Sequence, residues 1–261
     1  MTPPEVRKVQ LEVLAALDRH CREHGLTYYL GYGTLLGAVR HGGFIPWDDD
    51  VDVMMPRDDY ERLVDTFAAA APTHLSLGSQ RTQAGWPLPY AKVSDDRTVL
   101  VEPFEVPVAM GVNVDVFPLD PVPSGPLGRR VQAALLRRLG WALELRYIAA
   151  ERGRGWHGEA AIRLGKPVLR LVPMRLLVGM LSRCARWSGR GDRVGVRVGS
   201  SDWSVPPSSL GVPVEIGFEG LGCLAPADAD NVLTAMYGDY RTLPPDSKRL
   251  SHHAFTAHWK R

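Results

Sequence analysis

The sequence has few cysteines and no long apolar run. Its three cysteines, Cys21, Cys184 and Cys223, lie far apart and form no Cys-x-x-Cys pair, which excludes a disulfide-stapled scaffold and argues against a zinc site. The most apolar window, 169–181, is interrupted by arginine and proline and is too short to span a bilayer. Internal repeats, low-complexity tracts and nucleic-acid-binding motifs are also absent, so we expect no nucleic-acid partner.

The start of the sequence lacks the apolar segment of a secretion signal. Met1 is followed by threonine, two prolines and a charged amphipathic stretch. The composition, 45% hydrophobic and 23% charged, is typical of a globular protein with a sizeable core and excludes a disordered chain. These features predict a cytoplasmic protein whose cysteines are reduced thiols.

Positive charge is unevenly distributed along the chain. Residues 125–198 contain 16 Arg and Lys against 4 Asp and Glu, a local charge of +12, although the whole chain carries only +2. One interpretation is a surface for an anionic acceptor or for peripheral contact with the inner face of a membrane, which the interleaved Leu, Val and Trp residues favour. The other is a solvated face whose arginines pair with the acidic remainder of the chain.

Helical and strand periodicities alternate along the sequence. The predicted helices cover 3–25, 33–39, a segment that begins at 58 or 59, 127–150, 168–187 and a segment after Asp228. The predicted strands cover 26–30, 50–54, 89–93, 98–101 and 112–117, followed by a break at Pro118, Pro121 and Pro123. This order predicts an α/β (α+β) fold, a mixed sheet core flanked by helices. We assign a catalytic core to 1–124, a basic helical insertion to 125–200, and a part that completes the core to 201–261.

The densest candidate for chemistry is the acidic pair Asp50 and Asp52. Residues two apart on a strand point the same way, so both carboxylates would project together while Val51 and Val53 face the core. Paired carboxylates repel each other unless a cation lies between them, and Mg²⁺ prefers such oxygen ligands. In isolation, an Asp-x-Asp is more often a solvated acidic turn.

Two further features favour a metal site at Asp50 and Asp52 over a solvated turn. Asp115 recurs in an apolar–Asp–apolar pattern on another predicted strand, and three carboxylates on adjacent strands suit two-metal phosphoryl transfer. Upstream, Gly33 and Thr34 open a predicted helix, whose free N–H groups and dipole favour a bound phosphate. Strand, glycine turn, helix and Asp-x-Asp strand follow one another as in the nucleotidyltransferase fold.

Three sequence blocks, in this order, together resemble the LicD family, which includes fukutin-like proteins. The blocks are GTLLGAVRHGGFIPWDDDVDV at 33–53, VDVFPLD at 114–120, and a third that runs from YGDY at 237–240 through LPP at 243–245 to His252 and His253.

The resemblance implies a metal-dependent transferase that moves a phosphocholine-like group from a CDP-linked donor to a hydroxyl of a glycan or small-molecule acceptor. It implies that Asp50 and Asp52 are ligands of Mg²⁺, or of Mn²⁺, and that Asp115 is the third acid, a ligand or a base. Gly33 and Thr34 would contact the donor phosphate.

Several other residues are candidates with competing structural roles. Arg40 and His41 follow the small helix and would either neutralise pyrophosphate charge or interact with that helix's C-terminus. Lys92, on a predicted strand, is a candidate phosphate partner, although most isolated lysines are solvated.

The remaining candidates lie in the acidic block and in the C-terminal block. Asp48 shares the parity of Asp50 and would act as a general base or stabilise a turn, since Pro46 leaves the strand register open. His252 and His253 argue against a metal site, because adjacent histidines point to different sides of an extended chain. A phosphate or substrate contact and a role in packing are the two interpretations left for them.

Two other functions stay open at this stage. One is a nucleotidylyltransferase that transfers a nucleoside monophosphate from a triphosphate to a small molecule or protein. The other is a catalytically inactive nucleotide-binding scaffold, against which the presence of all three carboxylates argues. The carboxylates themselves do not distinguish the two kinds of transfer.

Overall fold

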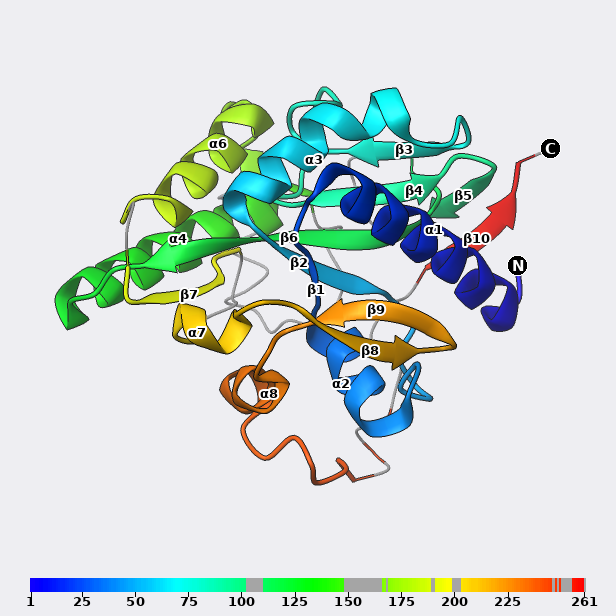
Figure 1. Ribbon diagram of the computed structural model, residues 1–261. Coiled ribbons are helices and arrows are strands. Elements are labelled where there is room, and N and C mark those ends of the chain that lie inside the picture. Colours follow the sequence, from blue (N-terminus) through cyan, green and yellow to red (C-terminus); the bar gives the residue numbers. More distant parts are fainter. Residues whose placement is uncertain are drawn as a thin grey trace.

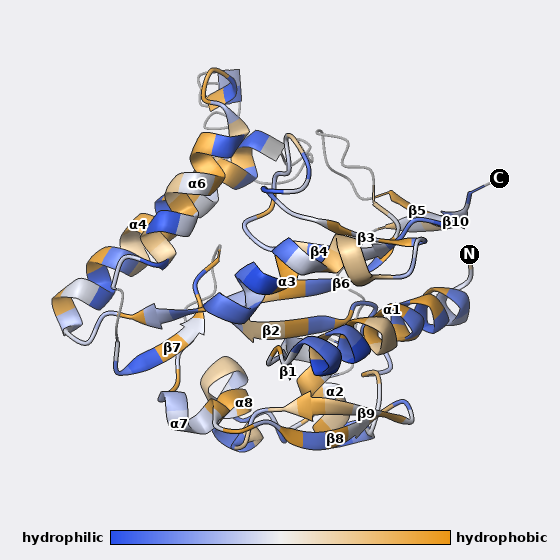
Figure 2. Ribbon diagram, turned by 45° about the horizontal axis from the view of Figure 1, so that its top comes forward, coloured by the Kyte–Doolittle hydropathy of each residue, from blue (hydrophilic) through white to orange (hydrophobic). Residues whose placement is uncertain are grey.

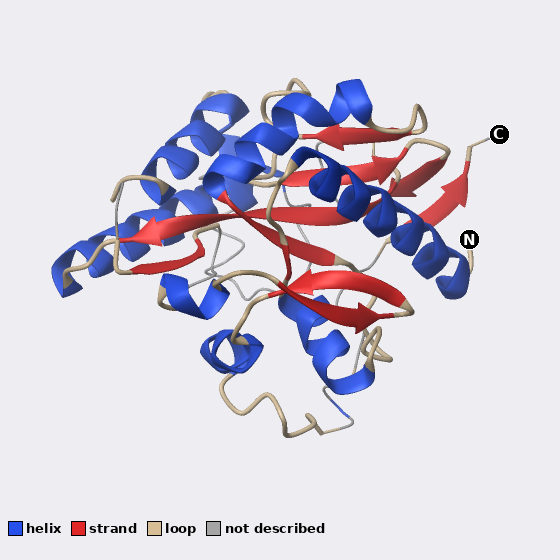
Figure 3. Ribbon diagram, viewed as in Figure 1, coloured by secondary structure: helices blue, strands red, loops and turns tan. Residues whose placement is uncertain are grey.

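The computed structural model describes residues 1–101, 110–147, 166–167, 169–188, 191–198, 203–245, 247, 249 and 255–260. Helices and strands are interspersed along these residues, and helices flank a mixed sheet (Figures 1 and 3). The predicted α/β (α+β) class is therefore confirmed. All three cysteines are free thiols, and Cys21 and Cys223 are buried.

The main sheet is built around one long central strand, β6, which crosses the molecule in Figure 3. The strand order is β1-β2-β6-β4-β3, and β7 pairs with the end of β6 beyond the residues that pair with β4. Only the β2–β6 pair is parallel; the others are antiparallel. The bounds are β1 Tyr29–Leu30, β2 Asp52–Pro56, β3 Leu75–Gly78, β4 Ala91–Asp95, β6 Val112–Val122 and β7 Arg193–Val196.

One face of this sheet is covered by α1 (Pro3–His24) and α3 (Arg57–Ala70), as Figure 1 shows. The covered face is apolar: Val53, Val114 and Val116 have no exposed surface. Both helices contribute apolar residues at the spacing that the sequence indicates, so the core lies between this helical layer and the sheet.

The shorter elements gather at the β1 edge of the sheet, where β9 contacts β1 and the end of α1. Here α2 packs against β2, β8 and α8, and the turn after β8 is tied to the turn after α2, because the Phe44 N–H donates to the Glu219 carboxylate. The bounds are α2 Tyr32–His41, α7 Pro207–Leu210, β8 Val214–Phe218, β9 Leu221–Ala225 and α8 Ala229–Tyr237, with a separate pair of β5 Thr98–Val101 and β10 Thr256–Trp259.

Two helices of the basic region, α4 (Pro126–Tyr147) and α6 (Met174–Ala185), pack against each other at one end of the sheet (Figure 1). The side-chain amide of Gln132 donates to the carbonyls of Cys184 and Ala185. Strand β7, which the sequence assigns to the basic insertion, joins the main sheet.

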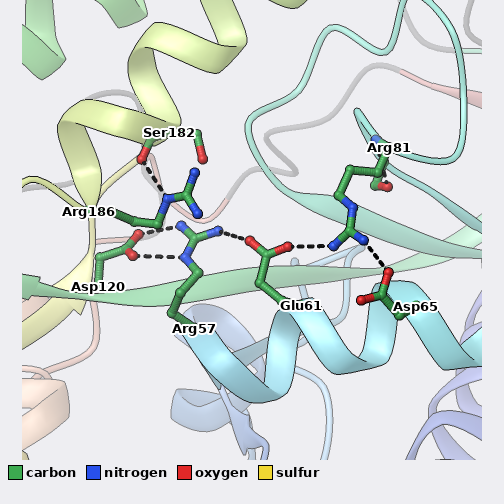
Figure 4. A network of polar contacts seen from close by, with 8 residues as sticks. Arg57, Glu61, Asp65, Arg81, Asp120, Ser182 and Arg186 are labelled. Atoms are coloured by element: carbon green, nitrogen blue, oxygen red, sulfur yellow. Dashed lines mark hydrogen bonds and ion pairs between the residues drawn. The ribbon is translucent and has the colours of Figure 1, made fainter. Parts of the chain in front are cut away.

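A polar network fixes α3 to the central strand (Figure 4). The carboxylate of Asp120, on β6, accepts two hydrogen bonds from the Arg57 guanidinium, at 2.8 and 2.5 Å, and Asp120 has no exposed surface. Arg57 also contacts Glu61, which pairs with Arg81. A bidentate buried pair of this kind holds its two elements in a single geometry.

Some sequence expectations differ from the structure. The predicted strand at 26–30 is reduced to β1 at Tyr29–Leu30. The predicted strand at 50–54 begins at Asp52, so Asp50 lies in the preceding loop. The predicted break is also wrong for two of its prolines, since β6 runs through Pro118 and Pro121.

The two prolines fit into β6 because neither position needs a backbone N–H to donate to a neighbouring strand. Pro118 lies between Val116, the last residue that pairs with β4, and Leu119, the first that pairs with β7. Pro121 lies beyond Leu119, where the pairing with β2 ends. A missing N–H at these positions costs no ladder hydrogen bond.

Candidate functional site

Three charged side chains lie in one row across three neighbouring strands. Asp52 on β2 is directly opposite Asp115 on β6, and Lys92 on β4 is opposite Asp115 from the other side. Because paired residues point to the same face of a sheet, the three side chains share the face that α1 and α3 do not cover. Asp115, the third acid that the sequence predicts on an adjacent strand, therefore stands beside Asp52.

Lys92 is bound to this row by an ion pair. Its Nζ lies 2.9 Å from Oδ1 of Asp115 and donates to the side-chain oxygen of Asn113 at 3.3 Å. Both partners of the ion pair are largely buried, with 6% and 13% of the side-chain surface exposed. A buried charge needs such partners, so the pairing holds both side chains at the site.

Asp52 is the buried acid of the row. Burial raises the pKa of its carboxyl well above the ordinary value, the neighbouring carboxylates of Asp50 and Asp115 raise it further, and Lys92 opposes the shift. A carboxylate in this environment gains stability from a cation placed beside it.

Helix α2 is attached to the row at its first turn. The Asp52 N–H donates to the hydroxyl of Thr34 at 2.8 Å, and the Gly31 N–H donates to the Asp52 carbonyl at 2.9 Å. The N-cap, Gly31, contributes no side-chain cap. The positive end of the helix dipole is thus fixed next to the carboxylates.

The loop before β2 brings a second set of acids together. Asp48, Asp49 and Asp50 each offer a carboxylate oxygen within 4.8 Å of the others. The loop is held through its backbone by α1: Arg7 donates to the carbonyl of Asp48 at 2.9 Å, and Gln10 donates to that of Asp49 at 2.8 Å. The sequence gives no local signal for these two tethers.

The acidic groups fit a hard divalent cation. Carboxylate oxygens are the ligands that Mg²⁺ prefers, and the loop acids lie close enough to share one ion. Asp50 and Asp48 also act electrostatically on Asp52, so loop and row form one negative site. Asp50, although it lies outside the strand, is still part of the site.

Gly33 lies against the acidic loop. A methyl group placed on its Cα would lie 2.1 Å from Oδ2 of Asp48. Only a residue without a side chain leaves the Asp48 carboxylate where it is. The glycine of the predicted phosphate turn therefore positions an acid of the site.

The other predicted residues lie at varying distances from the row. Arg40 donates to the carbonyl of Tyr240 at 3.0 Å, and burial lowers the pKa of its guanidinium. His41, in the last turn of α2, is exposed. His252 and His253 lie outside the described residues.

The C-terminal block contributes a residue that the sequence did not single out. Tyr237, the last residue of α8, belongs to the third resemblance block. Partial burial and the carboxylates of Asp52 and Asp48 raise the pKa of its hydroxyl, which stays protonated and can donate. Its place in a conspicuous motif is the signal that could have identified it.

Comparison with known proteins agrees with the sequence motifs. A family described as "LicD/FKTN/FKRP, nucleotidyltransferase domain" matches residues 25–122, which contain both the charged row and the acidic loop. Lipopolysaccharide cholinephosphotransferase LicD of Haemophilus influenzae is 28% identical across 97% of this chain and 96% of its own length. Ribitol 5-phosphate transferase FKRP of Homo sapiens is 40% identical over 58 residues, 22% of this chain and 12% of its own. The resemblance to the LicD family is confirmed, and these named relatives are transferases, as predicted for this chain.

We expect Gly33→Ala to disturb the site without unfolding the protein. The added methyl group displaces the Asp48 carboxylate, a flexible side chain, rather than backbone. Because a catalytic group misplaced by about 1 Å is enough to slow a reaction, we expect turnover to fall by about tenfold to a hundredfold. Steady-state kinetics and thermal melting would be compared with Gly217→Ala, where the new methyl group meets open space. Equal turnover in the two variants would contradict a role for Asp48.

We expect Asp52→Asn to stabilise the metal-free protein. A carboxyl whose pKa is raised on folding costs the folded state stability as pH rises through that pKa, and asparagine removes this cost. The melting temperature of the variant in EDTA should exceed that of the wild type, and more so at about pH 9 than at about pH 5. Mg²⁺ should raise the melting temperature of the wild type and not that of the variant. A difference that does not depend on pH would refute this account.

Proposed function

Because the chain is a relative of the LicD proteins, we propose that it transfers a phosphocholine-like group from a CDP-linked donor to a hydroxyl of a glycan or small-molecule acceptor. A relative aligned over 97% of this chain is named lipopolysaccharide cholinephosphotransferase. The alignment covers nearly the whole of both chains, so the proposal concerns the entire protein and not the motif region alone.

One observation carries the proposal. The row of Asp52, Asp115 and Lys92 and the acids at 48–50 form a single site inside the region that matches the family. A phosphate-containing donor needs both charges: carboxylates for a cation, and a cationic side chain with helix N–H groups for the phosphates themselves. Lys92 and the first turn of α2 provide the second set.

The reaction is a displacement at phosphorus. The acceptor oxygen forms a bond to the phosphorus that carries the alcohol, and the bond from that phosphorus to the oxygen of cytidine monophosphate breaks. Cytidine monophosphate leaves with the bonding electrons, and the proton of the acceptor hydroxyl passes to a carboxylate. Catalysis of this kind depends mainly on positioning and charge neutralisation.

Each residue of the site has a separate role in the proposed reaction. Asp50 of the loop and Asp52 of the row are the proposed ligands of Mg²⁺, or Mn²⁺, which would neutralise phosphate charge, and Asp115 stands opposite Asp52. Asp48, half-buried and held against Gly33, accepts the proton. Lys92 pairs with Asp115, and its ammonium and the hydroxyl of Tyr237, which acts electrostatically on Asp52 and Asp48, are the proposed contacts of the donor phosphates.

We predict Mg²⁺-dependent release of cytidine monophosphate from CDP-choline in the presence of a lipopolysaccharide-type acceptor. Asp115→Asn should lower the rate by about a hundredfold or more, since it removes a charge that acts on the reacting groups. Product release would be measured by chromatography. The matched control is Asp58→Asn, an exposed acid at the start of α3.

Turnover of a panel of donors distinguishes phospho-alcohol transfer from nucleotidyl transfer. It contains CDP-choline, CDP-ribitol, CDP-glycerol, ATP and GTP, each with Mg²⁺. Release of pyrophosphate from a triphosphate, with no turnover of CDP-alcohols, would replace the proposal with nucleotidyl transfer. Mg²⁺-independent binding without turnover of any donor would favour a scaffold.

We also propose that α4 and α6 form a surface for anionic membranes. Figure 2 shows hydrophobic and hydrophilic residues interleaved along both helices. Exposed arginines stand among exposed apolar side chains on each helix, and Glu144 is the only acid within the two helices as described. No helix in the described part of the chain is long and apolar enough to cross a membrane. The exposed residues are Leu127, Arg130, Val131, Leu135, Arg137, Arg138 and Trp141 on α4, and Arg175, Leu176, Met180 and Arg183 on α6.

This surface predicts binding to anionic vesicles. The double variant Arg137→Glu/Arg138→Glu should weaken sedimentation with vesicles of about one-third phosphatidylglycerol by at least about tenfold, because each basic residue near such a surface contributes about 1 kcal/mol. Arg19→Glu, an exposed site on α1, is the control. Equal binding of the wild type to pure phosphatidylcholine would contradict an electrostatic surface.

A further inference from the structure

A second row of side chains lies next to the charged row on the same sheet face. Met54 and Phe117 are paired across β2 and β6, each two residues beyond its acid, and Tyr90 directly precedes β4, two residues before Lys92. Residues two apart on a strand share a face and lie about 6.6 Å apart. An apolar, largely aromatic row therefore runs parallel to the charged row.

The aromatic rings are in contact with one another. The ring centroids of Tyr90 and Phe117 are 4.4 Å apart, and those of Tyr32 and Phe117 are 5.2 Å apart with the rings edge to face. Trp203 extends the group, 6.3 Å from Tyr32, and its indole N–H donates to the Tyr32 hydroxyl at 3.4 Å. Four rings thus form one aromatic wall: Tyr32, Tyr90, Phe117 and Trp203.

The backbone is strained where it places one of these rings. Tyr32 has φ = 42°, in the left-handed region that residues with side chains rarely adopt. The strained residue immediately follows the N-cap of α2, and its ring lies over Phe117. Strain of this kind persists where the surrounding structure enforces it and is concentrated at functional sites.

The wall differs from an ordinary core cluster. Tyr32, Tyr90 and Phe117 are each half-buried, whereas Val53 and Val116, on the opposite face of the same strands, have no exposed surface. Phe117 and Tyr90 lie two residues along their strands from Asp115 and Lys92, so these partly open rings stand next to the charged row.

We propose that this aromatic wall binds the quaternary ammonium end of the alcohol carried by the donor; this subsite rests on the proposed phosphotransfer. The faces of aromatic rings attract cations, and a methylated ammonium is held by such faces without needing hydrogen bonds. The two-carbon spacer of choline separates phosphate and ammonium by a span that matches the spacing of the two rows. A polyol would lose the hydrogen bonds of its hydroxyl groups against the rings.

The same placement explains the division of the site. The charged row receives the phosphate, and the aromatic wall, two residues further along the same strands, receives the alcohol. The ammonium of choline carries a positive charge toward a site whose loop and row are acidic, so ring faces and carboxylates act in the same direction. A neutral alcohol of the same shape would gain only the apolar contact.

The test compares phosphocholine with 3,3-dimethylbutyl phosphate, its neutral isostere. The wild type should bind phosphocholine about 3- to 30-fold more tightly, the range expected for cation–π contacts. Calorimetry gives both affinities. In Phe117→Leu the preference should fall toward equality, while Trp259→Leu, an exposed aromatic on β10, should retain it.

The outcomes separate the subsite from the reaction. Equal affinity of the wild type for the two phosphates, or no binding of either, overturns the subsite, and turnover of CDP-ribitol would then leave phosphotransfer intact. A preference for phosphocholine that depends on Phe117 supports the subsite. If this preference is found without turnover of any CDP-alcohol, the subsite stands and the proposed reaction fails. The wild-type comparison needs no variant to fold.

Discussion

The parallel pairing of β2 with β6 is the constraint on which the rest of the site depends. It places Asp52 opposite Asp115, and the antiparallel β4 then adds Lys92 to the same row. Because side chains alternate between the two faces, a slip of one residue in either strand would turn its carboxylate toward α1 and α3. The slipped strand would also expose its valine, Val53 on β2 or Val116 on β6, which is fully buried in the native register. The apolar core that stabilises the sheet therefore fixes the geometry of the charged row as well.

The acidic loop is positioned by a different means. It lies outside the sheet, so no ladder fixes it, and its three neighbouring carboxylates repel one another. Helix α1 offsets that repulsion through Arg7 and Gln10, which bind main-chain carbonyls of the loop. Gly33 completes the arrangement because α2 can then approach the carboxylate of Asp48 closely.

The sequence predicts the parts of the site that local patterns encode. Alternation around Asp52 and Asp115 indicated two strands, and a buried strand beside them accounts for Lys92. Contacts between distant segments leave no such pattern: Arg7 reaches the loop across about forty residues, and β7 joins the sheet from within a region dominated by helical signals. The strand boundary at Asp52 was misplaced because the alternation continues into the loop, where no partner strand lies opposite it. The aromatic wall was invisible for the same reason, since its four rings come from four separate segments.

The two faces of the sheet distribute stability and function differently. The valine face is close-packed, whereas the opposite face carries features that cost stability: a buried carboxylate whose pKa is raised, and the positive φ of Tyr32. Both features lie on or beside the same strands, so the distance from charged row to aromatic wall is set by strand geometry rather than by loops. Side chains of the wall can then change while the charged row stays in place. Relatives of this chain are named for cholinephosphate and for ribitol 5-phosphate transfer. If the proposed subsite is correct, a sheet of this kind can accept a different alcohol when only its second row changes.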